Sequence, residues 1–208
     1  MTTKNYFQII NLYPFLLPKI YVCLRAIILP VSKIEKLIPK KGSILDVGCG
    51  YGFTSIIFAQ NKNRRIIGSE INIKRFSLAK KISNSISNLS FENSDLIGQH
   101  NSKFDAILAI DLLHHLNSSQ KNIFLKDSFL KLKNNGLLII KDINTKPLIK
   151  YYWNYLHDLL MTKFSRLYFL SSSDIKMLLK KNNFKIIKQG TYSNYLYPHI
   201  FYVCQKNI

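Results

Sequence analysis

The sequence predicts an α/β protein with a mostly parallel sheet. Short apolar stretches typical of buried strands alternate with longer stretches that fit helices. Strands that alternate with helices indicate right-handed βαβ units, and therefore parallel strand pairs. The last two predicted strands are separated only by residues 191–198, too short for a crossover helix. The final strand is therefore expected to run antiparallel to its neighbours.

The first half of the chain carries four predicted strands and two predicted helices. In chain order these are strand 43–48, helix 52–61, strand 65–70, helix 73–84, strand 88–92 and strand 104–110. Ile73, Phe76, Ala79 and Ile82 recur at a spacing that predicts one buried face for the second helix.

The second half repeats the alternation. Its predicted elements are helix 118–133, strand 137–143, helix 173–182, strand 184–190 and strand 199–204. Ser118 or Ser119 is expected to cap the first of these helices, and Ser172 or Ser173 the second. The tripeptide at 134–136, Asn-Asn-Gly, predicts a stop and a turn before the fifth strand.

Two further segments flank this framework. Residues 1–41 precede the first strand, and we expect them to form a helical cover over a domain that spans 42–208. Contact of this apolar and basic segment with a membrane surface is the alternative. Residues 149–170 form an aromatic insertion after the fifth strand. This insertion could cover a bound hydrophobic substrate or simply pack on the sheet.

Composition places the chain among globular proteins. It is 47% hydrophobic, and its N-terminal apolar stretch is interrupted by prolines and basic residues before it could span a membrane. The N-terminal stretch lacks a small-residue cleavage site, so a secretory signal peptide is not expected. Three widely spaced cysteines fit a reducing cytoplasm, with a peripheral position at the inner membrane surface as a further option.

The formal net charge is +19, which raises the question of an anionic partner. Only five of the thirty basic residues are arginine, the side chain best suited to bidentate phosphate and base recognition. We therefore favour a biased, lysine-rich composition over a membrane surface or a nucleic acid.

The loop after the first strand reads DVGCGYG. It lacks the lysine of a phosphate-binding P-loop, and its glycines do not match the GxGxxG spacing of dinucleotide-binding turns. Asp46, two residues before the first glycine, would repel a pyrophosphate and attract a cation. S-adenosylmethionine (SAM), which carries an ammonium and a sulfonium but no phosphate, fits this loop. The glycines would let the backbone approach the ligand closely.

Three more acidic residues follow predicted strands. Glu70 ends the second strand and could accept both ribose hydroxyls of a nucleoside, Asp95 follows the third, and Asp111 follows the fourth. Ligands of open α/β sheets bind at the carboxyl ends of the strands, so these acids are expected at one site. For Asp95 alone, a helix N-cap is the structural alternative.

Together these motifs resemble the class I SAM-dependent methyltransferases. The resemblance rests on ILDVGCGYG, GSEIN, FENSDL, FDAILAIDLLHHL and LKNNGLLIIKD, and covers residues 42–145 closely and 173–208 by topology. It implies a Rossmann-like, seven-stranded, mostly parallel sheet with an antiparallel last strand and helices on both faces. The residues it implies for SAM binding are Asp46, Gly48, Cys49, Gly50, Glu70, Ile71, Asp95, Leu96 and Asp111.

The acceptor is less well defined by the sequence. The stretch DLLHHL differs from the [DN]PP[FYW] of amino-methylating nucleic-acid enzymes and is similar to the small-molecule and lipid branch, including quinone-biosynthesis methyltransferases. This predicts methyl transfer to oxygen or carbon of a small hydrophobic, aromatic or lipid-like acceptor, with no metal. An RNA methyltransferase and a non-catalytic SAM-binding protein are the alternatives. His115, His157 and Asp142 are the candidate catalytic residues.

Overall fold

The structure is a computed structural model that describes residues 3–95, 103–146, 148, 152, 155, 166–194 and 197–206. The chain divides into two compact units, Met1–Ala106 and Ile107–Ile208. Among the described residues, no helix is long and apolar enough to cross a membrane.

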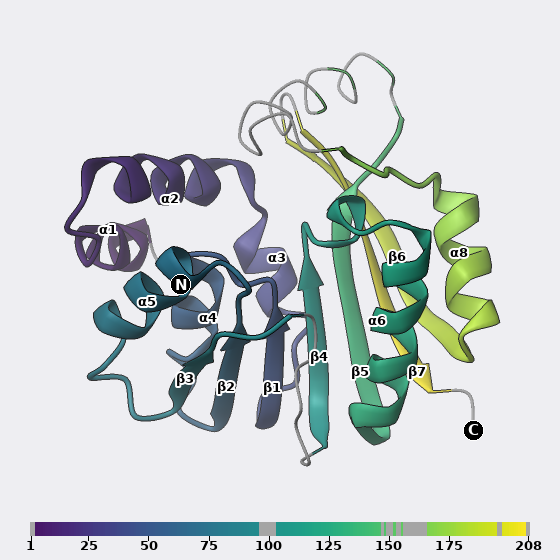
Figure 1. Cartoon of the computed structure of the whole chain (residues 1–208), viewed down its shortest axis with the longest axis horizontal. Coiled ribbons are helices and arrows are strands. Elements are labelled where there is room, and N and C mark those ends of the chain that lie inside the picture. The colour runs from purple at the N-terminus through teal and green to yellow at the C-terminus, as the bar shows by residue number, and fades with distance from the viewer. Residues whose placement is uncertain are drawn as a thin grey trace. The chain divides into compact units, whose positions relative to one another are not determined.

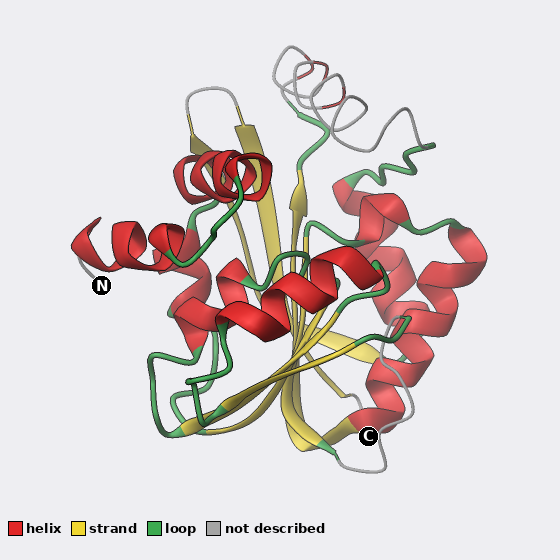
Figure 2. Cartoon of the chain, turned by 60° about the vertical axis from the view of Figure 1, so that its left-hand side comes forward, coloured by secondary structure: helices red, strands yellow, loops and turns green. Residues whose placement is uncertain are grey.

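The first unit opens with three helices and continues with alternating strands and helices (Figure 1). The helices are α1 (Thr3–Asn11), α2 (Leu16–Ile28), α3 (Val31–Glu35), α4 (Phe53–Phe58) and α5 (Ile73–Ile82). The strands are β1 (Gly42–Val47), β2 (Arg64–Ser69), β3 (Leu89–Glu92) and β4 (Phe104–Ile110), the last of which continues into the second unit. Helices α1 and α2 pack against each other (Figure 2).

The second unit carries the remaining elements. They are η1 (Leu113–His115, a 3₁₀ turn), α6 (Ser118–Lys131), β5 (Leu132–Ile143), α8 (Ser172–Lys181), β6 (Phe184–Asn194) and β7 (Tyr197–Lys206). The seven strands form one sheet in the order β3-β2-β1-β4-β5-β7-β6. β1 pairs with β2, and β2 with β3, in parallel, whereas β7 runs antiparallel to both β5 and β6. The predicted seven-stranded sheet with an antiparallel last strand is confirmed.

Several predicted boundaries are corrected. The helix predicted at 52–61 is the shorter α4, in which all six residues are buried. The apolar stripe predicted on α5 is only partly correct, because Ala79 is buried as predicted, whereas Ile73 is mostly exposed and the other buried side chain is Leu78.

The predicted helix caps are each displaced by one residue or more. Asn117 caps α6 through a capping box with Gln120, and Ser171 caps α8 through a capping box with Asp174. The chain also enters β5 directly at Leu132, without the turn expected at 134–136.

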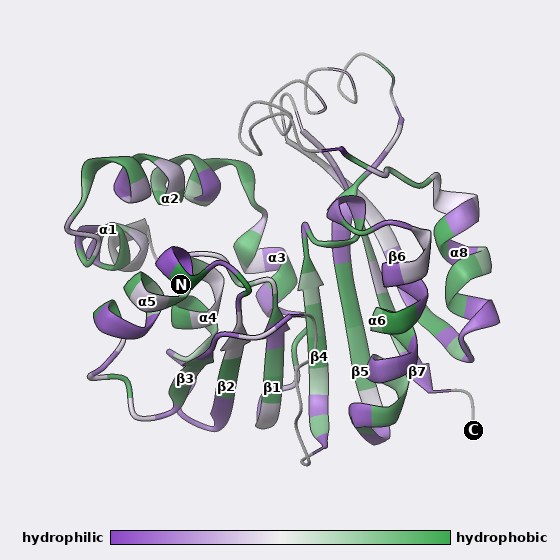
Figure 3. Ribbon diagram, viewed as in Figure 1, coloured by the Kyte–Doolittle hydropathy of each residue, from purple (hydrophilic) through white to green (hydrophobic). Residues whose placement is uncertain are grey.

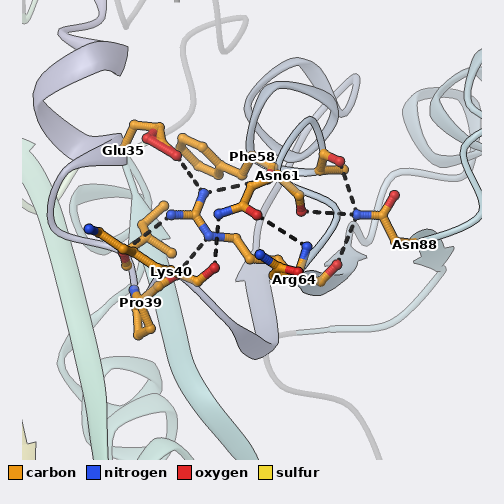
Figure 4. Close-up of polar contacts among 10 residues, drawn as sticks. Glu35, Pro39, Lys40, Phe58, Asn61, Arg64 and Asn88 are labelled. Atoms are coloured by element: carbon orange, nitrogen blue, oxygen red, sulfur yellow. Dashed lines mark hydrogen bonds and ion pairs between the residues drawn. The ribbon is translucent and has the colours of Figure 1, made fainter.

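A buried arginine fastens the start of β2 to the segment that follows α3. The guanidinium of Arg64 donates to Glu35 at 2.6 Å and to the carbonyls of Pro39 and Ile38 at 2.7 and 3.2 Å (Figure 4). The amide of Asn88 reaches the Arg64 carbonyl at 2.8 Å. Because a buried guanidinium needs several acceptors, this network fixes the end of α3 and the segment after it to the start of β2.

Candidate active site

The turn from β1 into α4 is built from glycines in a left-handed conformation. Gly48, Gly50 and Gly52 have φ angles of 70°, 61° and 79°, which side-chain-bearing residues rarely adopt. A Cβ on Gly50 would meet no atom within 4 Å, so the backbone there borders open space. A Cβ on Gly52 would lie 2.5 Å from the Phe91 ring. Gly50 therefore leaves room for a ligand, whereas Gly52 is required for packing on β3.

Glu70 ties this turn to the start of α5. One carboxylate oxygen accepts the backbone N–H of Gly50 at 2.8 Å, and the other accepts that of Asn72 at 2.8 Å. Hydrogen bonds to a charged acceptor are worth about 1.5–3 kcal/mol each. Glu70 is buried, and its carboxylate holds the glycine turn and the start of α5 together.

Asp46 lies beneath the same turn, at the end of β1. Its carboxylate accepts hydrogen bonds from the hydroxyls of Ser55 and Thr54 at 2.6 and 3.0 Å, in the first turn of α4. Burial raises the pKa of Asp46, and these hydroxyls, together with the charge of Arg25, offset part of that rise. The structure thus places Asp46 as an anchor of α4, and a direct contact with a ligand stays a prediction.

The other predicted SAM-binding residues of the first unit differ in exposure. Ile71 and Asp95 are exposed beyond β2 and β3, whereas Cys49 is buried among the carboxylates, and burial raises the pKa of its thiol. Leu96 lies outside the described residues.

Two asparagines that sequence reasoning missed shape this edge of the sheet. The Asn93 amide donates to the carbonyls of Glu70 and Ile71 at 2.8 and 2.9 Å. The Asn72 side chain caps α5 by accepting the N–H groups of Lys74 and Arg75. An asparagine directly before a predicted helix, as in GSEIN, was the signal for the second.

Aromatic side chains from the N-terminal helices meet the glycine turn. The Tyr13 hydroxyl donates to the Tyr51 carbonyl at 2.9 Å, and the rings of Tyr21 and Tyr51 contact edge to face with centroids 5.3 Å apart. The Arg75 guanidinium lies 5.9 and 5.7 Å from the centroids of these two rings. Tyr6 and Phe53 add a further ring pair. The turn is therefore bordered by aromatic surface and a cation–π contact.

In the second unit, the predicted strand-end acids are paired with basic side chains. Asp111, in a left-handed conformation with φ of 54°, pairs with Lys141. The Asp142 carboxylate lies 2.5 Å from His114 Nδ1 and also accepts the backbone N–H groups of His114 and Ile143 at 3.2 and 2.8 Å. His114 holds the pKa of Asp142 below its usual value, although burial acts in the opposite direction.

The surroundings of this pair are closely packed. The Phe169 ring stacks on His114 with centroids 5.1 Å apart, and Lys121 donates to the carbonyls of Leu116 and Tyr168 at 2.6 and 2.8 Å. The space beside the pair measures about 10 Å³, enough for no more than one water molecule. Burial lowers the pKa of Lys121. These contacts are those of a structural pair, and a catalytic role for Asp142 stays a prediction.

The two histidines of DLLHHL differ sharply. The structure brings Asp142 together with His114, which is buried, while His115 is exposed with its ring centroid 4.1 Å from that of His114. His115 is thus the histidine of this pair whose side chain is accessible to solvent. His157 and most of the aromatic insertion lie outside the described residues.

The residues around the glycine turn suit a cationic nucleoside without phosphates. Two buried carboxylates lie below the turn, and Gly50 borders open space. An ammonium or sulfonium would be attracted to this charge, whereas a pyrophosphate would be repelled. Among the residues that the structure describes, no cluster of three or more His, Cys, Asp or Glu could hold a metal ion.

One family profile and several known proteins match parts of this chain. The profile of a family described as "Methyltransferase domain" matches residues 23–189. A ribosomal protein L11 methyltransferase from Dictyoglomus turgidum is 28% identical over 122 residues, which cover 56% of this chain and 38% of that protein. Phosphoethanolamine N-methyltransferase 1 from Arabidopsis thaliana is 28% identical over 118 residues, which cover 55% of this chain and 24% of that protein. The chain thus spans well under half the length of these curated relatives.

A solved structure is similar over most of the chain. Magnesium protoporphyrin IX methyltransferase from Synechocystis PCC 6803, with bound S-adenosylhomocysteine, aligns with a TM-score of 0.64 and 23% identity. The alignment covers 85% of this chain and 81% of that chain. At this level of identity the likeness establishes a shared fold.

Proposed function

We propose that this chain, which belongs to the methyltransferase domain family of class I SAM-dependent methyltransferases, methylates oxygen or carbon of a small hydrophobic or aromatic acceptor. SAM is the cofactor of this family, and when bound it supplies an activated methyl group on its sulfonium. The protein's own task is then to hold the methyl donor and the acceptor in line. Such alignment can lower the activation free energy by up to about 7–11 kcal/mol.

The cofactor would be held by the turn after β1 and by the residues that follow β2 and β3. The observation that carries this proposal is the pair of hydrogen bonds from Gly50 and Asn72 to Glu70, which fixes both walls of the nucleoside site. In this site, the backbone of Gly48 and Gly50 would border the methionine portion of SAM. Glu70 would face the ribose, and Asp95 the adenine.

An apolar acceptor is supported by the aromatic border of the glycine turn. Tyr21 and Tyr51 present ring faces and edges, and the Arg75 guanidinium lies over both rings. Such a surface favours planar or hydrophobic molecules over highly charged ones. The curated relatives act on different acceptors, a ribosomal protein in one name and phosphoethanolamine in the other, so they do not choose between acceptor classes.

His115 is the candidate base among the described residues. An acidic acceptor such as a phenol must lose its proton, and an exposed imidazole can accept it. His115 meets that requirement by exposure, whereas His114 is held by Asp142. In a labelled-methyl assay, His115→Ala should lower kcat and flatten its rise with pH, and His115→Gln should not restore it.

Two measurements test the proposal in sequence. Calorimetry with SAM on wild type and Glu70→Ala tests the cofactor site, and failure of the wild type to bind at millimolar SAM would favour the non-catalytic alternative. Incubation of the protein with methyl-labelled SAM and cell extract follows. Label that partitions into organic solvent supports a hydrophobic acceptor, and label that stays on RNA or protein contradicts it.

An RNA acceptor is the second candidate, favoured only by the +19 charge. At least three of the five arginines are already engaged within the fold, Arg64 by carbonyls and Glu35, Arg75 by two tyrosine rings and Arg166 by the ring of Tyr168. A salt titration of RNA binding separates the candidates. A steep loss of affinity with rising salt, equivalent to several released ions, supports RNA, whereas no binding at low salt excludes it.

A lipid-like acceptor would be met at a membrane surface, so we also propose peripheral membrane contact. It is supported by the basic charge of the chain and by the apolar composition of the N-terminal helices.

A further inference from the structure

Helix α2 exposes an apolar face. Its outward side chains recur every three or four residues, a spacing that aligns them along one side of the helix. They are 41–79% exposed, although all are large and apolar; they are Leu16, Leu17, Ile20, Leu24 and Ile27. Phe7, Leu12 and Phe15 continue the exposed apolar surface onto α1 and the connection between the two helices. We call these eight residues the α2 face.

The opposite side of α2 is already packed. Val22 is fully buried, and Tyr21 contacts Tyr51 of the glycine turn. One side of the helix therefore packs on the protein, while the opposite side is apolar and exposed. Figure 3 shows the green of hydrophobic residues over most of the length of α2. A surface helix ordinarily places polar residues on its outer side, so an outer face of this kind marks an interaction surface.

A groove adjoins the α2 face on the surface of α5. It measures about 340 Å³, and its lining combines Phe15, Ile73 and Leu78 with the lysines Lys74 and Lys81. Ile73, which the sequence pattern would have buried, is 56% exposed here. Apolar side chains next to lysines suit an amphiphile whose polar end is negatively charged.

Charge decides which occupant the surface favours. Residues 1–41 contain seven Lys and Arg but one acid, Glu35, which is engaged with Arg64. The whole chain carries +19, so two copies facing each other would repel. An anionic lipid surface instead attracts basic residues, by about 1 kcal/mol for each Lys or Arg near it.

We infer that the α2 face and its adjoining groove dock this protein on an anionic phospholipid membrane. The apolar side chains insert at the boundary between headgroups and acyl chains, and the lysines meet the phosphates. Tyr21 and Tyr13 link this docking element to the glycine turn. The inference rests on the proposed function for its purpose, because it brings the methyl donor close to acceptors dissolved in the membrane.

Vesicle co-sedimentation of the full chain tests the inference. The vesicles are phosphatidylcholine alone and phosphatidylcholine mixed with phosphatidylglycerol. Wild type should bind the mixed vesicles strongly and the neutral vesicles weakly. The double variant Leu17→Glu/Ile20→Glu should lower the partition coefficient at least about tenfold. Lys74→Gln/Lys81→Gln should lower it about fivefold for each lysine.

A matched control adds the same charge elsewhere. Leu130→Glu/Met177→Glu replaces two exposed apolar residues of α6 and α8 and should leave the partition coefficient unchanged. Equal binding by wild type and Leu17→Glu/Ile20→Glu would overturn the inference, as would equal binding of wild type to neutral and anionic vesicles. A wild-type dimer in lipid-free sedimentation that dissociates in Leu17→Glu/Ile20→Glu would also overturn it, in favour of a second copy.

Calorimetry with SAM keeps this test separate from the proposed function. Leu17→Glu/Ile20→Glu should bind SAM as wild type does, which also shows that the variant is folded. Vesicle binding without SAM binding would defeat the proposed function and leave the docking surface standing. SAM binding without vesicle binding would defeat the docking surface and the proposed membrane contact, and would leave the proposed methyltransferase activity standing.

Discussion

The carboxylates that end β1 and β2 have different partners from those that end β4 and β5. In the first unit, Asp46 and Glu70 accept hydrogen bonds from hydroxyls and backbone N–H groups. In the second unit, Asp111 and Asp142 pair with Lys141 and His114. Neutral donors leave the negative charge of a carboxylate in place, and at Asp46 the charge of Arg25 offsets only part of the effect of burial, whereas Lys141 and His114 lie directly against the acids of the second unit. Acids at equivalent strand ends therefore accept hydrogen bonds from neutral donors in one unit and pair with basic side chains in the other, and it is the first group that the proposed cationic ligand would meet.

The largest expected effect comes from removing Glu70. Glu70→Ala should lower SAM affinity at least about a hundredfold, because two charge-assisted hydrogen bonds of about 1.5–3 kcal/mol each are lost from the turn and from α5. Glu70→Gln should lose less, since its carbonyl oxygen can still accept one of the two N–H groups. Calorimetry with SAM measures both variants. Equal affinity of wild type and Glu70→Ala would remove Glu70 from the cofactor site.

Breaking the buried pair in the second unit should act on stability. His114→Ala leaves Asp142 buried without its basic partner, which should cost about 3–5 kcal/mol in the free energy of unfolding. The double variant His114→Phe/Asp142→Leu should recover part of this loss, because it removes the buried charge as well. Urea unfolding measures the series. A His114→Ala variant as stable as wild type would contradict the assignment of a structural pair.

The pH dependence of stability should differ in sign between Asp142 and Asp46. The pKa of Asp142 is held below its ordinary 3.8, so its contribution is complete above that value and is lost as pH falls through the lower, folded pKa. The pKa of Asp46 is raised, so between 3.8 and the folded pKa the native state binds more protons, and stability decreases as pH rises.

Urea unfolding at a series of acidic pH values checks these signs. The stability difference between wild type and Asp142→Asn should shrink as the solution is acidified. The difference between wild type and Asp46→Asn should shift in favour of wild type over the same acidification. The same sign for both variants would refute the contrast between the two environments.

The smallest expected effects come from the helix caps. Asn72→Ala and Ser171→Ala should each cost about 1 kcal/mol in the free energy of unfolding. Asn72→Ala keeps the backbone N–H that Glu70 accepts, but losing the cap should loosen the start of α5 that presents this N–H and so weaken SAM binding, whereas Ser171→Ala should leave SAM binding unchanged. Ser118→Ala, at a serine that does not cap α6, serves as the control and should change neither quantity.

Local pattern predicted some elements closely and others poorly. β4 occupies the predicted residues 104–110, because an unbroken apolar run between polar residues is a local signal. The caps were missed although a signal was present, since Asn117 with Gln120 and Ser171 with Asp174 have the spacing of a capping box. The exposure of Ile73 had no such signal, because it depends on what packs on α5.

The sequence by itself determined the order of strands and helices, the glycine turn and the acids at the strand ends, because these follow from short-range periodicity and spacing. Only the tertiary structure decided the partners of those acids. Glu70 reaches Gly50 across 20 residues, and Asp142 reaches His114 across 28. It also decided that α2 is seated by Val22 and leaves its larger apolar side chains outside. Such outcomes depend on which side chains the fold brings within hydrogen-bonding or packing distance, and separation along the chain does not specify that distance.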